Sequence, residues 1–362
     1  MDTLPFPPLM KLVLGGPQER AVFEGTSFGA DADAAGEVVF NTGMTGYVEA
    51  LTDPSYRGQI LVLTYPLQGN YGVPKEPWES GGVQVAGLVV GRLAIRPTHP
   101  GMRDTLSDWL SAAGVPALEG VDTRAITRRL RAEGTMSGLL LRDERIAERP
   151  TALDMRHVAQ QVAEPGIHRH GNGERRVLVI DCGTKRSIIQ SLVDRGLSVV
   201  HAAFFEAWEP LLDEVDAVVL PNGPGDPAVL GALVERLRPL LDGKKPVLGI
   251  CLGHQLLALA AGATTYKLPY GHRSQNQPVV DLTTRRTYLT SQNHGYAVRT
   301  ESIPKGFVPW FQNLNDGTNE GLAHETLPLM SVQFHPEAAS GPHDTQHVFD
   351  RFAQAVLARP RS

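Results

Sequence analysis

The chain has 362 residues, of which 42% are hydrophobic and 20% are charged, and its formal net charge is −5. This length predicts two globular domains, because single domains commonly span roughly 100 to 200 residues. The composition excludes a disordered or fibrous chain, and the acidic balance argues against a nucleic-acid-binding protein.

The cysteine content and the apolar segments indicate a cytoplasmic protein. Only Cys182 and Cys251 are present, too few for a disulfide framework or a cysteine-based metal site. The first residues carry an acid and prolines where a secretory signal carries basic and then apolar residues. The most apolar segment, residues 247–263, contains glycines, a histidine and a glutamine. We therefore expect a buried core segment there and no membrane association.

The N-terminal half mixes short strands with two helical patterns. The expected strands include residues 38–40 and 60–63, and the expected helices are residues 103–113 and 122–133. Asp122 or Thr123 is positioned to cap the second helix. These patterns predict a strand-rich mixed α/β domain over residues 1–168.

A stretch rich in glycine, proline and charge interrupts the apolar periodicity at residues 164–176, and we place a linker at residues 169–175. The remaining residues 176–362 alternate short apolar strands with helices. Expected strands are residues 177–180, 199–200, 217–220, 247–250 and 329–334, and expected helices are residues 187–195, 228–241 and 254–261. This alternation predicts a doubly wound, mainly parallel sheet.

In such sheets, ligands bind at the carboxyl ends of the strands. The strand that ends at Ile250 is followed there by Gly-Ile-Cys-Leu-Gly, with Cys251 in the middle and a helix directly after. This pattern is typical of a nucleophile elbow with cysteine in place of serine, and a helix start favours a thiolate. Taken alone, the turn is equally consistent with Cys251 being a buried structural cysteine.

A second cluster favours the nucleophile. The apolar strand at residues 329–334 runs into His335, Pro336 and Glu337. A cysteine nucleophile needs an imidazole to hold the thiolate, and a carboxylate can orient that imidazole. We therefore interpret Cys251, His335 and Glu337 as a catalytic triad.

The same residues do not predict a metal site. His-x-Glu also occurs in zinc deaminases, but the Pro-Cys-x-x-Cys motif that accompanies it there is absent. We interpret His254, His272 and His294 as structural or loop residues. An oxyanion hole is expected from the backbone N–H of Leu252, with a second donor from the glycine-rich loop at residues 222–226.

Three motifs in order resemble the class I, or triad, glutamine amidotransferase domain. They are Asn-Gly-Pro-Gly-Asp-Pro at residues 222–227, Gly-Ile-Cys-Leu-Gly-His-Gln at 249–255 and His-Pro-Glu at 335–337. The N-terminal half adds resemblance to one family, the small subunit of glutamine-dependent carbamoyl phosphate synthetase. That resemblance rests on residues 40–47, 51–56, 63–66, 69–72 and 121–124, together with 291–296 and 341–344.

The resemblance implies that Cys251 attacks the side-chain amide of L-glutamine, that His335 transfers protons, and that a glutamyl thioester is hydrolysed to release ammonia. It implies Leu252 and Gly223 as oxyanion donors. The glutamine contacts that it implies are Ser55, Gly223, Gly225, Leu252, Gln255, Asn293, Gly295 and Tyr296. Ser55 would contribute from the N-terminal domain.

The resemblance also implies a partner, a large subunit that forms a heterodimer or a higher hetero-oligomer with this chain. That subunit would receive the ammonia and use bicarbonate, ATP and Mg to make carbamoyl phosphate for arginine and pyrimidine synthesis. No cofactor is expected on this chain, which lacks a Gly-x-x-x-x-Gly-Lys-Ser/Thr loop. Two alternatives stay open, an independent cysteine amidohydrolase and a non-catalytic regulatory module of the same fold.

The sequence departs from the family pattern in one loop. Ser274, Gln275 and Gln277 stand where relatives usually have a glycine, a small residue and a histidine. Tyr296 stands where phenylalanine is frequent, and we expect this change to keep glutamine binding because the aromatic ring is retained.

Overall fold

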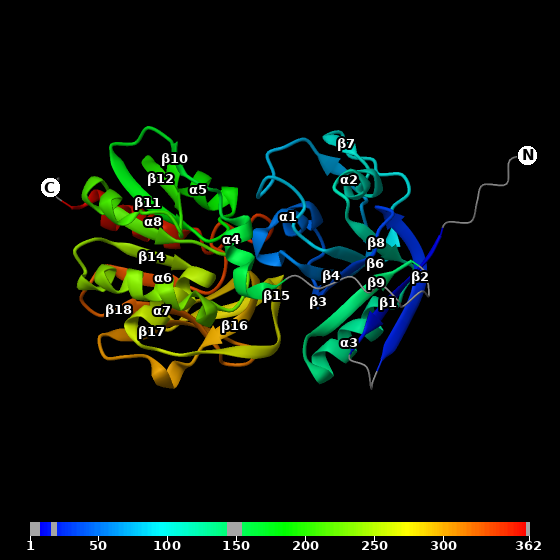
Figure 1. Cartoon of the computed structure of the whole chain (residues 1–362). Coiled ribbons are helices and arrows are strands. Elements are labelled where there is room, and N and C mark those ends of the chain that lie inside the picture. The colour runs from blue at the N-terminus through cyan, green and yellow to red at the C-terminus, as the bar shows by residue number, and fades with distance from the viewer. Residues whose placement is uncertain (1–7, 16–19, 143–153, 360–362) are drawn as a thin grey trace, which may run out of the picture. The chain divides into compact units, whose positions relative to one another are not determined.

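A computed structural model describes residues 8–15, 20–142 and 154–359. The chain divides into two compact units, one up to Asp154 and one from Met155 onward (Figure 1). The division lies ahead of residues 169–175, where we expected the linker. Residues Ile167–His170 form the strand β10 and pair with the second sheet, so this stretch is part of the second unit. Among the described residues, no helix is long and apolar enough to cross a membrane.

The first unit is built around a closed barrel. Its strands in spatial order are β1 (Leu9–Leu14), β2 (Ala21–Gly29), β8 (Pro116–Glu119), β6 (Gly87–Leu93), β4 (Gln59–Gln68), β3 (Ala34–Asn41) and β9 (Met136–Leu141). The barrel closes because β9 also pairs with β1. The short strands β5 (Val73–Pro74) and β7 (Met102–Asp104) pair separately. The expected strands at residues 38–40 and 60–63 lie inside β3 and β4.

Among the described residues of the first unit, three α-helices accompany the barrel, α1 (Tyr47–Thr52), α2 (Leu106–Ala112) and α3 (Thr123–Glu133). The predicted cap of α3 is confirmed, because Asp122 Oδ1 accepts a 2.8 Å hydrogen bond from the N–H of Ala125. The helix expected at residues 103–113 starts later than predicted. Thr105 caps it by accepting from the N–H of Asp108, and the residues before it form β7.

The second unit contains a ten-stranded sheet that is parallel at its centre. In spatial order the strands are β10 (Ile167–His170), β12 (Leu197–Ala203), β11 (Arg175–Asp181), β13 (Ala217–Leu220), β14 (Val247–Ile250), β19 (Leu329–Val332), β18 (Asn319–His324), β17 (Phe307–Asn313), β15 (Thr265–Asp281) and β16 (Thr287–Val298). The strands from β12 to β19 are parallel, whereas β10 and the four strands from β18 to β16 pair antiparallel. The predicted doubly wound, mainly parallel domain is confirmed in this core.

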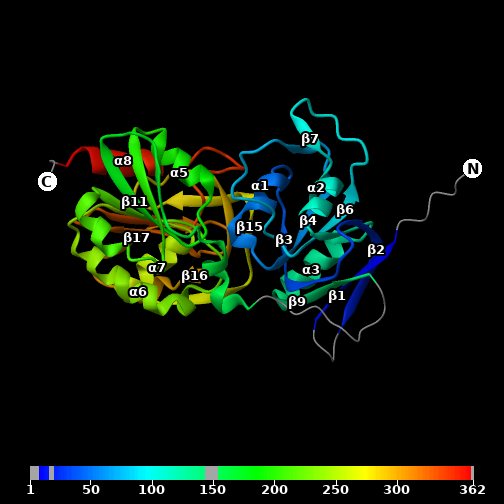
Figure 2. The same cartoon turned by 45° about the horizontal axis from the view of Figure 1, so that its top comes forward.

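Helices cover both faces of the parallel strands (Figure 2). Alternate residues of β11 pack on opposite faces of the sheet. Val177 and Val179 pack with α5 (Arg186–Val193) and α8 (His347–Leu357). Leu178 and Ile180 pack with α6 (Gly231–Leu237) and α7 (Leu252–Ala261). Burial on both faces explains why these strands are apolar without alternation.

The helix expected at residues 228–241 is shorter than predicted. Only α6 is α-helical there, between the 3₁₀ turns Pro227–Leu230 and Arg238–Asp242. Pro239 lies inside the second turn, and proline has no N–H to continue an α-helix. A further short helix, α4 (Val158–Val162), precedes β10.

Candidate active site

Cys251 lies in the strained turn that joins β14 to α7. Its φ is 53°, a rare value for a residue other than glycine, and its N–H donates to the carbonyl of Val332 at 2.9 Å. The glycines on both sides are required by space. A Cβ at Gly249 would lie 2.6 Å from the carbonyl oxygen of Gly253, and a Cβ at Gly253 would overlap the carbonyl oxygen of Leu220. Backbone strain of this kind persists where the surrounding structure holds a functional side chain in place.

The loop after β19 brings His335 and Glu337 to the same edge of the sheet. The N–H of His335 donates to the carbonyl of Ser291 at 2.9 Å, which fixes the loop against β16. Nδ1 of His335 lies 2.6 Å from Oε1 of Glu337, and both side chains are buried. Nδ1 therefore carries the proton that Glu337 accepts, and Nε2 is left for proton transfer.

The environment of His335 favours the imidazolium form. Burial alone lowers the pKa of His335, but the charges of Glu337 and of Cys251 beside it raise the pKa by more, to about 10. An imidazolium beside the sulfur stabilises a thiolate, the reactive form of cysteine. The structure thus brings Cys251, His335 and Glu337 together, and their role as a catalytic triad stays a prediction.

A residue that the sequence analysis did not single out completes the site. Lys185 follows β11, is buried, and places Nζ 2.9 Å from Oε1 of Glu337 and 3.2 Å from the carbonyl of Ala338. Its backbone N–H donates to Oδ1 of Asn222, another fully buried side chain. Burial by itself raises the pKa of Glu337, but the charges of Lys185 and His335 lower the pKa by more, to about 2. Glu337 is therefore held as a carboxylate.

The two expected oxyanion donors lie next to each other. Leu252 is the first residue of α7, where backbone N–H groups have no acceptor within the helix. A Cβ added to Gly223 would approach Cδ2 of Leu252 to 2.7 Å, so the loop after β13 reaches the start of α7. The backbone of Gly223 thus lies beside the residue that follows Cys251, and the role of the two N–H groups as an oxyanion hole stays a prediction.

The remaining expected glutamine contacts of the second unit lie on α7, on β16 and in the loop after β13. Asn293 presents its carbonyl oxygen 3.6 Å from Sγ of Cys251. Gln255 donates from Nε2 to the carbonyl of Tyr296 and to Oε1 of Gln333, both at 2.9 Å. Gly295 lies next to the guanidinium of Arg273 on β15, and Gly225 next to Val158 on α4. Segment 293–296 is thus held against the nucleophile helix.

Ser55 lies in the first unit, in the 3₁₀ turn Pro54–Tyr56. Its N–H donates to Oδ1 of Asp53 at 2.9 Å, and its side chain is largely buried. Its contact with glutamine stays a prediction.

The three histidines expected to be structural are buried on α7, β15 and β16. His254 places Nδ1 2.9 Å from Oγ of Ser331, and burial lowers its pKa to about 3, so the ring is neutral. His272 and His294 lie opposite each other on β15 and β16.

The residues that depart from the family pattern lie on β15 and have polar or buried surroundings. Ser274 is buried, Gln275 donates to Oγ of Ser340, and Gln277 accepts from Asn315.

Comparison with known proteins covers both units. Residues 178–355 match the family described as Glutamine amidotransferase class-I, and residues 17–140 match the family described as Carbamoyl-phosphate synthase small chain, CPSase domain. The carbamoyl phosphate synthase small chain of Symbiobacterium thermophilum is 48% identical over 352 residues, which cover 94% of this chain and 97% of the relative.

Two further relatives extend the similarity. The carbamoyl phosphate synthase small chain of Methanopyrus kandleri is 46% identical over 351 residues, covering 92% of this chain and 96% of the relative. The carbamoyl phosphate synthase arginine-specific small chain of Chaetomium globosum is 45% identical over 356 residues, covering 94% of this chain and 77% of the relative.

Proposed function

The chain belongs to the carbamoyl phosphate synthase small-chain family, and from this premise we propose that Cys251 hydrolyses L-glutamine. The chain is the glutamine-hydrolysing subunit of carbamoyl phosphate synthase. The observation that carries the proposed chemistry is the buried contact of His335 with Glu337 beside the strained turn of Cys251. A structural cysteine needs neither the strain nor the charged partners.

The reaction proceeds in two half-reactions. The thiolate of Cys251 attacks the side-chain amide carbon of glutamine, and the N–H groups of Leu252 and Gly223 stabilise the oxyanion that forms. The imidazolium of His335 gives its Nε2 proton to the leaving nitrogen, so ammonia departs and a glutamyl thioester remains. His335 then takes a proton from water, which attacks the thioester carbon and releases glutamate and the thiolate.

Glu337 and Lys185 act on His335 rather than on the substrate. Glu337 keeps the ring oriented and stabilises the charge that appears on it in each half-reaction. Lys185 keeps the carboxylate ionised, because its Nζ lies 2.9 Å from Oε1 of Glu337. No cofactor is required for these steps.

Glutamine is held by the segments that converge on Cys251. Asn293, Gly295 and Tyr296 lie on β16, Gln255 lies on the nucleophile helix, and Gly225 lies in the loop after β13. The ammonia passes to a large subunit, which forms a heterodimer with this chain and uses ATP, Mg and bicarbonate.

The product serves biosynthesis in the cytoplasm. Fungal relatives are named arginine-specific small chains, which supports a role in arginine synthesis. Carbamoyl phosphate would also supply pyrimidine synthesis.

Replacing Cys251 with serine in the complex with the large subunit tests this function. We expect glutamine-dependent carbamoyl phosphate synthesis to fall at least about 10³-fold, since the nucleophile is lost, while ammonia-dependent synthesis continues. The matched control is Cys182→Ala, which removes the other buried thiol and should keep both activities. Loss of both activities, or of neither, in Cys251→Ser would contradict the assignment.

A further inference from the structure

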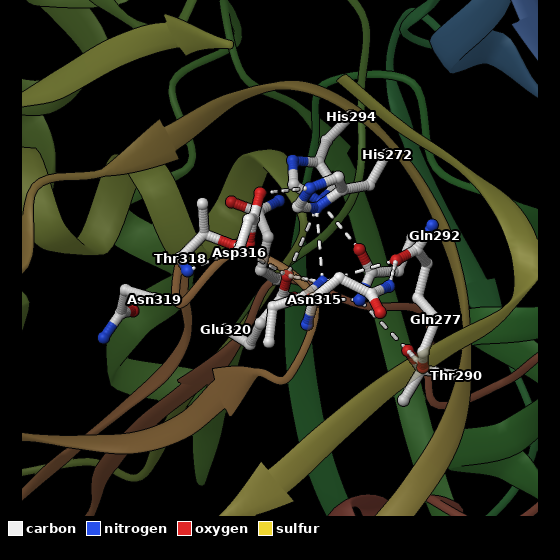
Figure 3. Close-up of polar contacts among 12 residues, drawn as sticks. His272, Gln277, Thr290, Gln292, His294, Asn315, Asp316, Thr318, Asn319 and Glu320 are labelled. Carbon is white, nitrogen blue, oxygen red and sulfur yellow. Dashed lines mark hydrogen bonds and ion pairs between the residues drawn. The ribbon is translucent and has the colours of Figure 1, made fainter. Parts of the chain in front are cut away.

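A second cluster of polar side chains lies in the antiparallel part of the second sheet. His272 comes from β15, His294 from β16 and Glu320 from β18, and all three are buried (Figure 3). One potential ligand atom of each lies within 4.8 Å of the others. The rings of His272 and His294 meet edge to face with centroids 4.9 Å apart. Two imidazoles and a carboxylate form a common ligand set for zinc.

Outer partners hold both imidazoles in the orientation that metal-binding histidines need. Nδ1 of His294 lies 2.8 Å from the carbonyl oxygen of Tyr296, which accepts its proton and leaves a lone pair on Nε2. Nε2 of His272 lies 2.9 Å from Oδ2 of Asp316, so its Nδ1 points towards Oε1 of Glu320 at 3.4 Å. Metal-bound histidines usually donate their second N–H to a carbonyl or carboxylate in this way.

One polar contact in the cluster has no proton to share. Nε2 of His294 lies 3.1 Å from Oε1 of Gln292, although both atoms are acceptors when the ring is neutral. The amide nitrogen of Gln292 meanwhile donates to Oε2 of Glu320 at 3.1 Å. Turning the amide over would satisfy His294 but would place the amide oxygen against the carboxylate. Either orientation leaves two lone pairs facing each other, which a bound cation or an added proton resolves.

Two separations between the proposed ligand atoms match those in a tetrahedral site. Ligand atoms about 2.1 Å from zinc are about 3.4 Å apart in a tetrahedron. The separation of His272 Nδ1 from Glu320 Oε1 is 3.4 Å, and that of His294 Nε2 from Gln292 Oε1 is 3.1 Å. The carboxylate of Glu320 faces this point, and that of Asp316 contacts Nε2 on the other side of the His272 ring, so a divalent cation would balance the charge of both.

We propose that His272, His294 and Glu320 bind one divalent transition-metal ion of the zinc class, with the amide oxygen of Gln292 as the fourth ligand. The ion has a structural role, because it ties β15, β16 and β18 together and takes no part in glutamine hydrolysis, although its ligands Gln292 and His294 flank Asn293 in β16. The amide of Asn313, now 3.1 Å from Oε1 of Glu320 and 3.5 Å from Nδ1 of His272, would turn aside.

A proton competes with the metal ion for Nδ1 of His272. Burial lowers the pKa of His272, but Asp316 and Glu320 raise it by more, to about 9. Metal binding must displace that proton from Nδ1, so the measurement belongs above neutral pH.

The test is metal binding by the full-length chain after chelator treatment. We expect one equivalent of Zn²⁺ by elemental analysis, and one equivalent of Co²⁺ with the strong visible absorption of a tetrahedral site. His272→Asn and Glu320→Gln should each weaken the affinity by about 100-fold or more. The matched control is His201→Asn, which removes a buried histidine 3.3 Å from the carboxylate of Asp181, and it should bind as the wild type does.

Two results would overturn the proposal. One is a wild-type chain that retains less than a tenth of an equivalent and shows no Co²⁺ absorption, which would assign the place to a proton. The other is metal binding that both ligand variants keep. The first result is measured on the wild-type chain alone, so a variant that fails to fold does not weaken the test. Neither result depends on glutamine hydrolysis.

Discussion

Lys185 contacts Glu337 on the side chain's Oε1 atom and keeps that carboxylate charged. Its Nζ and Nδ1 of His335 both contact Oε1 of Glu337, so one carboxylate oxygen lies between two cations. The sequence predicted Cys251, His335 and Glu337, because a motif places each beside glycines or at a strand end. It could not predict Lys185, whose contact with Glu337 joins residues 152 positions apart and follows no local pattern.

Replacing Lys185 with methionine should raise the pKa of Glu337 and weaken the orientation of His335. We expect kcat with glutamine to fall by about 10- to 100-fold, in the range of lost outer-sphere partners. The acidic limb of the pH profile should move to higher pH, because Glu337 would take up a proton sooner. The measurement is glutamine hydrolysis against pH.

Lys245→Met provides the control for the loss of one lysine. Its Nζ donates to the carbonyl of Val215, away from the triad, and activity should not change. A Lys185→Met enzyme with an unchanged pH profile would remove Lys185 from the mechanism. Lys185→Arg, which keeps the charge, should recover part of the activity.

The raised pKa of His335 makes stability depend on pH. Its pKa is about 10 in the folded protein against 6.5 in an unfolded chain, so the folded state binds the proton more tightly. This stabilisation is fully present below pH 6.5 and is lost as the pH rises through about 10. We expect the difference in free energy of unfolding between the wild type and His335→Gln to fall over that range, by at most about 1.4 kcal/mol per pH unit. Urea unfolding at several pH values measures it, and a difference that stays flat or grows would contradict the ion pair.

At the scale of elements, the turn between β14 and α7 depends on close backbone approach. Replacing Gly253 with alanine should destabilise the protein by about 3 kcal/mol or more, because the added Cβ overlaps the backbone of β13. Gly231→Ala is the control, since no atom lies within 4 Å of its added Cβ and its φ is −52°, at the start of α6. That change should be neutral or stabilise by up to about 1 kcal/mol. Thermal unfolding compares the two variants, and equal stability would contradict the steric account of the elbow.

The capped start of α3 offers a second measurement at this scale. Asp122→Ala removes the acceptor for the N–H of Ala125 and should cost about 1 kcal/mol of stability. Arg128→Ala, on the exposed face of the same helix, should change stability by less than about 0.5 kcal/mol. An Asp122 variant as stable as the Arg128 variant would show that the cap contributes nothing.

Helix lengths show what local patterns miss. The apolar spacing over residues 228–241 predicted one helix, yet only Gly231–Leu237 is α-helical. Apolar periodicity records which side chains are buried, and 3₁₀ turns bury nearly the same side chains as an α-helix. The strands of the parallel core were easier to predict, because burial on both faces requires continuous apolar runs.

At the scale of the whole molecule, glutamine hydrolysis is useful only while a synthase consumes ammonia. We expect the purified chain to hydrolyse glutamine slowly, and addition of the large subunit to raise kcat/KM by about 5- to 150-fold, the usual range for coupled sites. Steady-state assays with and without the partner measure the ratio. Rapid hydrolysis that the partner leaves unchanged would favour an independent amidohydrolase.

The sequence by itself determined the family, and it predicted two domains and the candidate triad of Cys251, His335 and Glu337. These features depend on local geometry, in which glycines around a nucleophile and apolar strands leave a direct trace in residue order. The tertiary structure decided the closure of the N-terminal barrel, the place of β10 in the second sheet, and the contacts of Lys185 and of the His272 cluster. Those contacts join residues distant in the chain, and their burial and charge exist only once the strands have assembled.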